Sequence, residues 1–230
     1  MKKFTTIHLL FFALVAMSFF QSCKKAKEDV VEPPVPDQTS TQEFDNVAGA
    51  TGAGWKFINK SETQTATTVG FVNGTGGSAY SGAGFISAGF AANSGAGVIS
   101  TWAISPKVML QNGDKISFYT RSINNYSSPP DVYPDRLQLR LALADKDSVG
   151  PGTETGLFGI SLVDINPGYS STLPTAYPAT WTKFEGTISG LNKPTAGRYA
   201  FRYFVEDGGT AGANSNGIHL DKVQYTSVNH

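Results

Sequence analysis

The three histidines are the first side chains to consider for catalysis, and their positions do not support it. His8 lies in an apolar N-terminal run, His230 is the last residue, and His219 alternates with apolar neighbours. The sequence contains neither the Gly-x-Ser-x-Gly nucleophile elbow nor the His-Glu-x-x-His metal motif. The sequence leaves open a pair of catalytic carboxylates of the glycosidase kind, because the two groups must be close in space and need not be close in the chain. Most acidic residues lie in turn-like segments, so we expect no enzyme activity and no catalytic residue.

A glycine-rich segment matches part of a dinucleotide-binding motif. Residues 74–79 read G-x-G-x-x-A and follow a strand-like run over residues 69–73. The motif needs a helix next and an acidic residue roughly 20 positions later. Residues 80–84 (YSGAG) cannot hold a helix, and residues 93–95 (NSG) contain no acid. We interpret the segment as a hairpin or loop, and we expect no nucleotide ligand.

The single cysteine, Cys23, lies where an export signal would be cleaved. A basic start precedes an almost unbroken apolar run over residues 9–20, which has the length of a signal-peptide core and is too short for a membrane helix. The following Phe-Gln-Ser-Cys resembles the looser lipoprotein signal of the Bacteroidetes, with Lys24 next. We expect residues 1–22 to be removed and Cys23 to carry acyl chains, palmitate among them. Several chains on one residue would anchor the protein stably.

Residues 23–42 have the composition of a tether. Charged residues are followed by Pro33, Pro34 and Pro36 and then by small polar residues. Prolines favour an extended polyproline II conformation, and large apolar residues for a core are missing. We expect one domain over residues 43–229, held by this tether at the outer membrane on either its periplasmic or its external face. A simple secretory signal that contains a cysteine is the alternative.

Tyrosines and polar groups are mixed in residues 124–133 (NNYSSPPDVY). Exposed tyrosine rings can stack on a sugar face while carboxylates and amides bind its hydroxyls. Tyr126, Asp131 and Tyr133 are therefore the candidate ligand-binding residues. The alternative is a proline-stiffened connection whose tyrosines pack back on the core.

Composition and periodicity indicate an all-β domain. Charged residues make up 16% of the chain, aromatic residues 12%, and the 18 basic residues balance the 18 acidic ones. This balance argues against a nucleic-acid partner, which requires a basic face. Several segments alternate with a period of two, so that one row of side chains faces a core and the other faces water. The apolar rows are Leu137, Leu139, Leu141 and Leu143; Tyr199, Phe201, Tyr203 and Val205; and Ile116 with Phe118.

The last apolar segment changes phase. Ile218 and Leu220 share one parity, whereas Val223 and Tyr225 have the other. A β-bulge near Asp221 would return both pairs to the same side of a sheet. With turn-forming clusters between the runs, the pattern predicts an antiparallel sandwich or jelly roll.

Several segments together resemble the choice-of-anchor J domains, which are related to the cleaved adhesin domains of bacterial surface proteases. Residues 100–106 and 110–114 look like the family's W-x-I-S-P and L-x-N-G-D segment, and residues 217–223 resemble its closing I-G-I-D-x-V. Further similar segments occur in the same order at residues 133–137, 164–167, 177–181 and 197–203. The resemblance covers roughly residues 43–226 and implies a jelly-roll β-sandwich, of the galactose-binding or MAM-like kind. His219 stands where the family usually has glycine.

The resemblance also implies a structural calcium ion. Many sandwich modules of this type bind calcium where the first strand meets the last, using the oxygen ligands that the ion prefers. The matching positions here are Glu43, Asp45 and Asp221. The alternative is that these carboxylates cap turns or face water. No other cofactor is expected.

These observations predict a lipid-anchored, adhesin-like module of the cell envelope that binds glycan or a surface protein without chemistry. A structural or assembly lipoprotein of an envelope complex is the second interpretation, and an enzyme is the third. Ser148, within an Asp-Ser-Val triplet, matches the O-glycosylation acceptor pattern of the Bacteroidetes.

Overall fold

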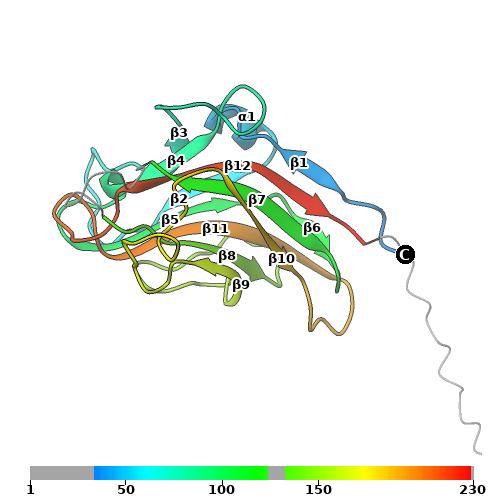
Figure 1. Cartoon of the computed structure of the whole chain (residues 1–230). Coiled ribbons are helices and arrows are strands. Elements are labelled where there is room, and N and C mark those ends of the chain that lie inside the picture. The colour runs from blue at the N-terminus through cyan, green and yellow to red at the C-terminus, as the bar shows by residue number, and fades with distance from the viewer. Residues whose placement is uncertain (1–33, 124–132, 229–230) are drawn as a thin grey trace, which may run out of the picture. The chain divides into compact units, whose positions relative to one another are not determined.

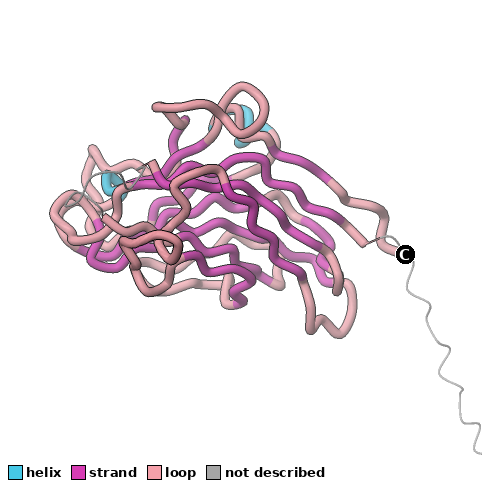
Figure 2. The backbone as a smooth tube through the Cα atoms, in the orientation of Figure 1, coloured by secondary structure: helices cyan, strands magenta, loops and turns pink. Residues whose placement is uncertain are grey.

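The computed structural model describes residues 34–123 and 133–228, whose regular structure is nearly all β-strand (Figures 1 and 2). The first antiparallel sheet has the order β10 (Thr182–Thr187), β7 (Lys115–Ser122), β12 (Gly217–Thr226), β4 (Ile86–Gly89), β3 (Val72–Asn73), with β1 (Ser40–Gln42) also paired to β12. The second has the order β2 (Lys56–Asn59), β5 (Gly97–Ile104), β11 (Thr195–Gly208), β8 (Leu137–Ala142), β9 (Ile160–Ile165), with β6 (Val108–Leu110) also paired to β11. Two short helical segments interrupt the strands, α1 (Val47–Gly52) and the 3₁₀ turn η1 (Phe90–Ala92). No helix within the described ranges has the length and apolar character needed to cross a membrane.

The two sheets pack face to face, and the alternation seen in the sequence forms the core between them. Leu137, Leu139 and Leu141 of β8 are at most 2% exposed. They belong to one cluster with apolar side chains of β11, β7 and β12. Burying alternate residues on the two inner faces is what closes a sandwich. The prediction of an all-β, antiparallel jelly-roll sandwich is confirmed.

The change of phase in β12 is the predicted β-bulge. Its pairing with β7 shifts register between Asp221 and Gln224, and Lys222 has a positive φ of 42°. The extra residue returns the later apolar residues to the core side. All four core positions are at most 1% exposed, namely Ile218, Leu220, Val223 and Tyr225.

Part of the outer face of the second sheet is covered, which corrects the expectation that its polar row faces water. Gln138 is 4% and Arg202 only 1% exposed, because the connection between β8 and β9 folds over this face. Arg202 Nη2 donates to the carbonyl oxygen of Gly152 at 2.5 Å. Phe158 packs against Trp102 with ring centroids 5.6 Å apart. Strand periodicity assigns residues to a face, but it carries no information about a covering loop.

The first strand lies inside the segment that its composition marks as a tether. Residues 40–42 form β1 and pair with residues 223–225 of β12. Just before β1, the Gln38 carboxamide donates to the Met109 carbonyl at 3.1 Å and accepts from the Met109 amide at 2.8 Å. A three-residue polar edge strand has no apolar alternation, so the sequence gives no sign of it.

Candidate functional site

The predicted site residues are only partly within the described structure. Cys23, Tyr126 and Asp131 lie outside the described residues. Tyr133 is described and is 44% exposed. Leu143, expected in the core row of β8, is also 44% exposed, because β8 ends at Ala142.

Tyr133 lies at the end of the sandwich opposite to the start of β1. At the near end, β1 begins and β12 finishes next to the C-terminus (Figure 1). At the far end, the chain turns from β11 into β12, β4 runs into η1, and β8 begins (Figure 1). We call this the distal end. Loops at one end of a rigid sandwich are where binding residues are usually found.

A cleft of about 390 Å³ opens at the distal end, and we call it the distal cleft. Two aromatic rings, Phe90 and Tyr133, line it together with the β11–β12 connection. The other lining residues are Gly209, Thr210, Ala211, Gly212, Asn214, Ser215 and Asn216. Its volume lies near the lower end of the roughly 300–1,000 Å³ range of small-molecule sites. None of these described side chains carries a formal charge.

Phe90 is a large apolar residue whose side chain is exposed to solvent. Its side chain is 46% exposed because η1 turns the chain outward immediately after β4. The turn is held by a hydrogen bond from the Asn93 amide to the Phe90 carbonyl at 3.2 Å. An exposed aromatic ring forfeits the roughly 1.5–3 kcal/mol that full burial would contribute. Its position beside a second exposed ring therefore marks a contact surface.

The wall that carries Tyr133 is fixed by backbone pairing with the opposite wall. The Tyr133 carbonyl accepts from the Asn216 amide at 3.1 Å, and the Pro134 carbonyl accepts from the Ser215 amide at 2.9 Å. Beneath these residues lies Asp135, which is completely buried. Its carboxylate accepts from the Gly217 amide at 2.7 Å and from the Tyr203 hydroxyl at 2.6 Å. The start of β12 and the start of β8 are thus joined below the cleft.

Burial perturbs this carboxyl group. It raises the pKa of Asp135 to about 7, although hydrogen bonds from Tyr203, Gly217, Ser122 and Asn216 act in the opposite direction. Asp135 does not line the cleft, so we assign it to positioning.

The connection 209–216 is itself held in shape. The Ser215 hydroxyl accepts from the Gly209 amide at 2.8 Å, and the Thr210 hydroxyl accepts from the Gly95 amide at 2.7 Å. Gly209 has a φ of 97°, where a side chain is strained. A Cβ there would also lie 2.2 Å from the Gly95 carbonyl oxygen. The cleft floor therefore requires glycine at this position.

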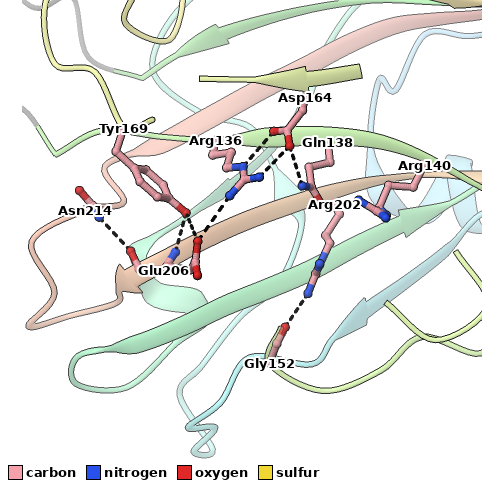
Figure 3. A network of polar contacts seen from close by, with 9 residues as sticks. All are labelled: Arg136, Gln138, Arg140, Gly152, Asp164, Tyr169, Arg202, Glu206 and Asn214. Carbon is pink, nitrogen blue, oxygen red and sulfur yellow. Dashed lines mark hydrogen bonds and ion pairs between the residues drawn. The ribbon is translucent and has the colours of Figure 1, made fainter. Parts of the chain in front are cut away.

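A polar network braces the base of the connection (Figure 3). Arg136 donates from Nε and Nη2 to both carboxylate oxygens of Asp164, at 2.8 and 2.7 Å. Its Nη1 also lies 3.4 Å from Glu206 Oε2. The Tyr169 hydroxyl accepts from the Glu206 amide at 2.9 Å. Asn214, which lines the cleft, donates from Nδ2 to the Glu206 carbonyl at 2.9 Å (Figure 3).

The same outer face holds two arginines without a carboxylate partner in the described chain. Arg140 donates to the carbonyl oxygens of Phe158 and Gly159, at 2.7 and 3.0 Å. Arg202 stacks over Phe204 and Trp102, with its Cζ 4.0 and 4.8 Å from the ring centroids. Burial, followed by repulsion from Arg140 and Arg136, lowers the pKa of Arg202 to about 9. Both guanidinium groups fasten the covering loop to the sheet.

The three carboxylates suggested for calcium do approach one another, around the loop that follows β3. Asp221 Oδ2 accepts from the amides of Tyr80 and Ser81, at 2.8 and 3.0 Å. Asp45 Oδ1 accepts from the Gly84 amide at 3.2 Å. Glu43 Oε2 is buried and has no hydrogen-bond partner among the residues that the structure describes.

The charge balance of this cluster is unfavourable. Burial raises the pKa of Asp221, with a smaller contribution from the negative charge of Glu43. A cation would relieve this repulsion and satisfy the unpaired oxygen. No group of three or more histidine, cysteine or acidic side chains in the described ranges is arranged to hold a metal ion, so backbone carbonyls or water would have to complete a site. The calcium hypothesis stays a prediction.

A larger groove of about 660 Å³ runs between the edge strands β9 and β10. Its lining is mainly aliphatic, and Leu173 is 51% exposed. Its one aromatic ring, Phe184, packs inward against Phe118. The groove therefore lacks an exposed ring for stacking on a sugar, although it is the larger of the two.

Sequence reasoning missed Phe90 and the connection 209–216. Residues 207–209 (DGG) indicate only a turn, and Phe90 looks like one more core residue of an apolar run. The single available signal is that Phe90 follows Gly89, a residue that ends strands readily.

Comparisons with known proteins support the fold. No family model matches the chain, and no curated protein matches it significantly. Among solved structures, the K1 cleaved adhesin domain of Lys-gingipain from Porphyromonas gingivalis W83 is 16% identical with a TM-score of 0.52, over 83% of this chain and 99% of that one. The K3 domain of the same protein is 16% identical with a TM-score of 0.49, over 84% and 100%. The module TmCBM61, solved with β-1,4-galactotriose, is 10% identical with a TM-score of 0.43, over 81% and 97%. At this identity the K1 likeness shows a shared sandwich fold.

Proposed function

We propose that the chain is a non-catalytic binding module that takes a glycan in the distal cleft. The observation that carries the proposal is the pair of exposed rings, Phe90 and Tyr133, on a cleft that is otherwise lined by small and uncharged polar residues. Sugar rings have an apolar face that stacks on aromatic side chains and a rim of hydroxyls that needs hydrogen bonds. The cleft offers both.

The hydrogen-bonding groups come from the β11–β12 connection. The Asn216 carboxamide forms no hydrogen bond within the described part of the chain, and Asn214 uses only its Nδ2 atom there. The Thr210 hydroxyl accepts one hydrogen bond and keeps its own proton available. These groups can donate to and accept from hydroxyls without moving the backbone. A preformed site of this kind avoids part of the entropy cost of binding.

The proposal that the module is non-catalytic also rests on the residues that line the distal cleft. A glycosidase places two carboxyl groups beside the bond that it breaks. No carboxylate and no imidazole is among the lining residues that the structure describes at the distal cleft. Glu206, an acid in the network at the base of the connection, accepts hydrogen bonds from Arg136 and Tyr169.

We also propose that the module is a lipoprotein of the cell envelope, anchored through Cys23 at the outer membrane. The motif order over residues 43–226 and the shared fold of a cleaved adhesin domain support assignment to the choice-of-anchor J type. The distal cleft lies at the opposite end of the sandwich from the start of β1.

A structural or assembly role is the second candidate, and the groove between β9 and β10 favours it. Both strands are edges of their sheets, and Ile160 and Leu157 nearby are 41% and 44% exposed. Unprotected apolar edges are where sheets accept another chain. Co-purification of an envelope protein that is lost on Ile160→Lys would support this role.

A glycan array with the purified full-length protein in detergent tests the leading proposal. Phe90→Ala and Tyr133→Ala should each weaken binding about five- to tenfold, because a lost aromatic contact costs on the order of 1 kcal/mol. Leu157→Ala is the matched control, since Leu157 has similar exposure but does not line the cleft. Absence of glycan binding, or binding that the two aromatic variants leave unchanged, would contradict the proposal.

A further inference from the structure

We infer that the distal cleft selects neutral saccharides and rejects anionic ones such as uronates and sulfated sugars. The inference rests on the proposed function and specifies its ligand class. Recognition of an anionic sugar normally uses arginine, lysine or a cluster of free amides. None of the residues that line the cleft is basic, and the whole connection 209–216 contains no lysine or arginine.

The cation in the network at the base of the connection, Arg136, is already neutralised. Arg136 uses its Nε and both terminal nitrogens on the carboxylates of Asp164 and Glu206, at distances of 2.7 to 3.4 Å (Figure 3). Its guanidinium also lies over the rings of Phe204 and Tyr169, 5.0 and 5.9 Å from their centroids. It therefore has no free edge to offer a carboxylate or a sulfate in the cleft.

The connection is fastened to the backbone of two acidic residues and, among the described residues, to no basic one. The Asn214 amide donates to the Asp207 carbonyl at 3.0 Å, and its side chain donates to the Glu206 carbonyl at 2.9 Å. Asp207 is exposed, and no ion pair forms on its carboxylate within the described residues. A negative charge brought into the cleft would therefore find no cation among the described lining residues to offset the loss of its hydration.

The size of the cleft sets the length of the recognised unit. A volume of about 390 Å³ between two rings accommodates one or two sugar residues and not a long stretch of chain. The ligand class is thus a short neutral segment or the neutral end of a larger glycan.

A pair of lysine substitutions gives the sharpest test. Ala211 and Ala213 are both exposed and lie in the same connection, but only Ala211 lines the cleft. The full-length protein, Ala211→Lys and Ala213→Lys should be titrated with a neutral oligosaccharide that is positive on the array and with its uronate counterpart. For the unmodified protein we expect the uronate to bind at least tenfold more weakly. Ala211→Lys should improve uronate binding about five- to tenfold, and 0.5 M salt should remove the gain; Ala213→Lys should not improve it.

The outcomes separate this inference from the proposed function. Uronate binding that equals or exceeds neutral binding, and that Tyr133→Ala weakens, overturns the inference and leaves glycan binding in place. An equal gain with Ala213→Lys also overturns it, because the charge would then act outside the cleft. Absence of binding to either sugar class overturns both the inference and the proposed function.

Discussion

His219 makes the stability of the protein depend on pH in mild acid. The imidazole is 2% exposed, its Nδ1 has no hydrogen-bond partner among the described residues, and the Phe85 ring lies 4.4 Å from it between centroids. Burial, followed by the positive charge of Arg121, lowers the pKa of His219 from 6.5 to about 4. The folded protein therefore holds this histidine uncharged at pH values where the unfolded chain protonates it.

The sign and size of the effect follow from proton linkage. Between pH 6.5 and 4 the unfolded chain binds a proton at His219 and the folded protein does not, so the free energy of unfolding falls as the pH falls. Above pH 6.5 neither state is protonated, and the contribution is constant. A pKa difference of about 2.5 units corresponds to roughly 3 kcal/mol, at about 1.36 kcal/mol per unit.

Replacement of His219 by glutamine isolates this contribution. The free energy of unfolding should be measured by urea denaturation of both proteins at pH 7, 6, 5 and 4. Groups that titrate in both proteins cancel, including Asp135, whose raised pKa acts in the opposite direction and adds stability as the pH falls from about 7. The difference, wild type minus variant, should decrease by about 3 kcal/mol between pH 7 and pH 4.

A difference that stays constant over this range would refute the reasoning, as would an imidazole NMR signal of His219 that titrates near pH 6.5. Arg121→Gln serves as a second variant. Because Arg121 is the smaller cause of the shift, this variant should raise the folded-state pKa of His219 only partly. The loss of stability should still begin near pH 6.5, but it should be smaller and should end at a slightly higher pH.

Three further predictions concern stability. Arg202→Met should lower the free energy of unfolding by at least about 2 kcal/mol, since buried carbonyls such as that of Gly152 lose a charged donor. Arg140→Met, at a half-buried position, should lower it less when both variants are measured by chemical denaturation. An equal decrease for the two variants would contradict this account. Gly84→Ala should lower the melting temperature, because the added Cβ would lie 2.1 Å from the Asp45 carbonyl oxygen. Gly52→Ala should leave it unchanged, because no atom lies within 4 Å of the added Cβ. Calorimetry of both variants measures the two melting temperatures. The melting temperature should be higher in calcium than in EDTA, and Asp221→Ala should abolish this difference. Equal melting temperatures of the wild type in calcium and in EDTA would refute the calcium hypothesis.

The sequence predicted the structure correctly where the side-chain periodicity of a single strand is sufficient to do so. Leu137, Leu139 and Leu141 point to one side of a strand whatever surrounds it, so their burial could be predicted. The phase change after Leu220 located the bulge at Asp221 for the same reason. Residues 111–114 (QNGD) form a turn that is closed by a hydrogen bond from the Asp114 amide to the Gln111 carbonyl at 3.2 Å. Turn chemistry of this kind is complete within four residues.

The candidate site depends on contacts between segments that are remote in the chain. Phe90, Tyr133 and Asn214 come together only because β4, β8 and β12 begin or end at the same end of the sandwich. Neither their spacing nor their types indicate this. Tyr133 was selected for its residue type and local composition, and the cleft beside it was not foreseen.

By itself, the sequence determined the all-β class, the strand faces and the bulge, because each depends on the types and spacing of neighbouring residues; the export signal at Cys23 stays a prediction. Only the tertiary structure decided that Arg202 is buried and that Phe90 is not. A loop of residues 143–159 covers the arginine, and a turn after Gly89 exposes the phenylalanine. Burial is a property of the packed chain, because it depends on which distant segment arrives to exclude water, and that is set by the whole fold and not by local periodicity.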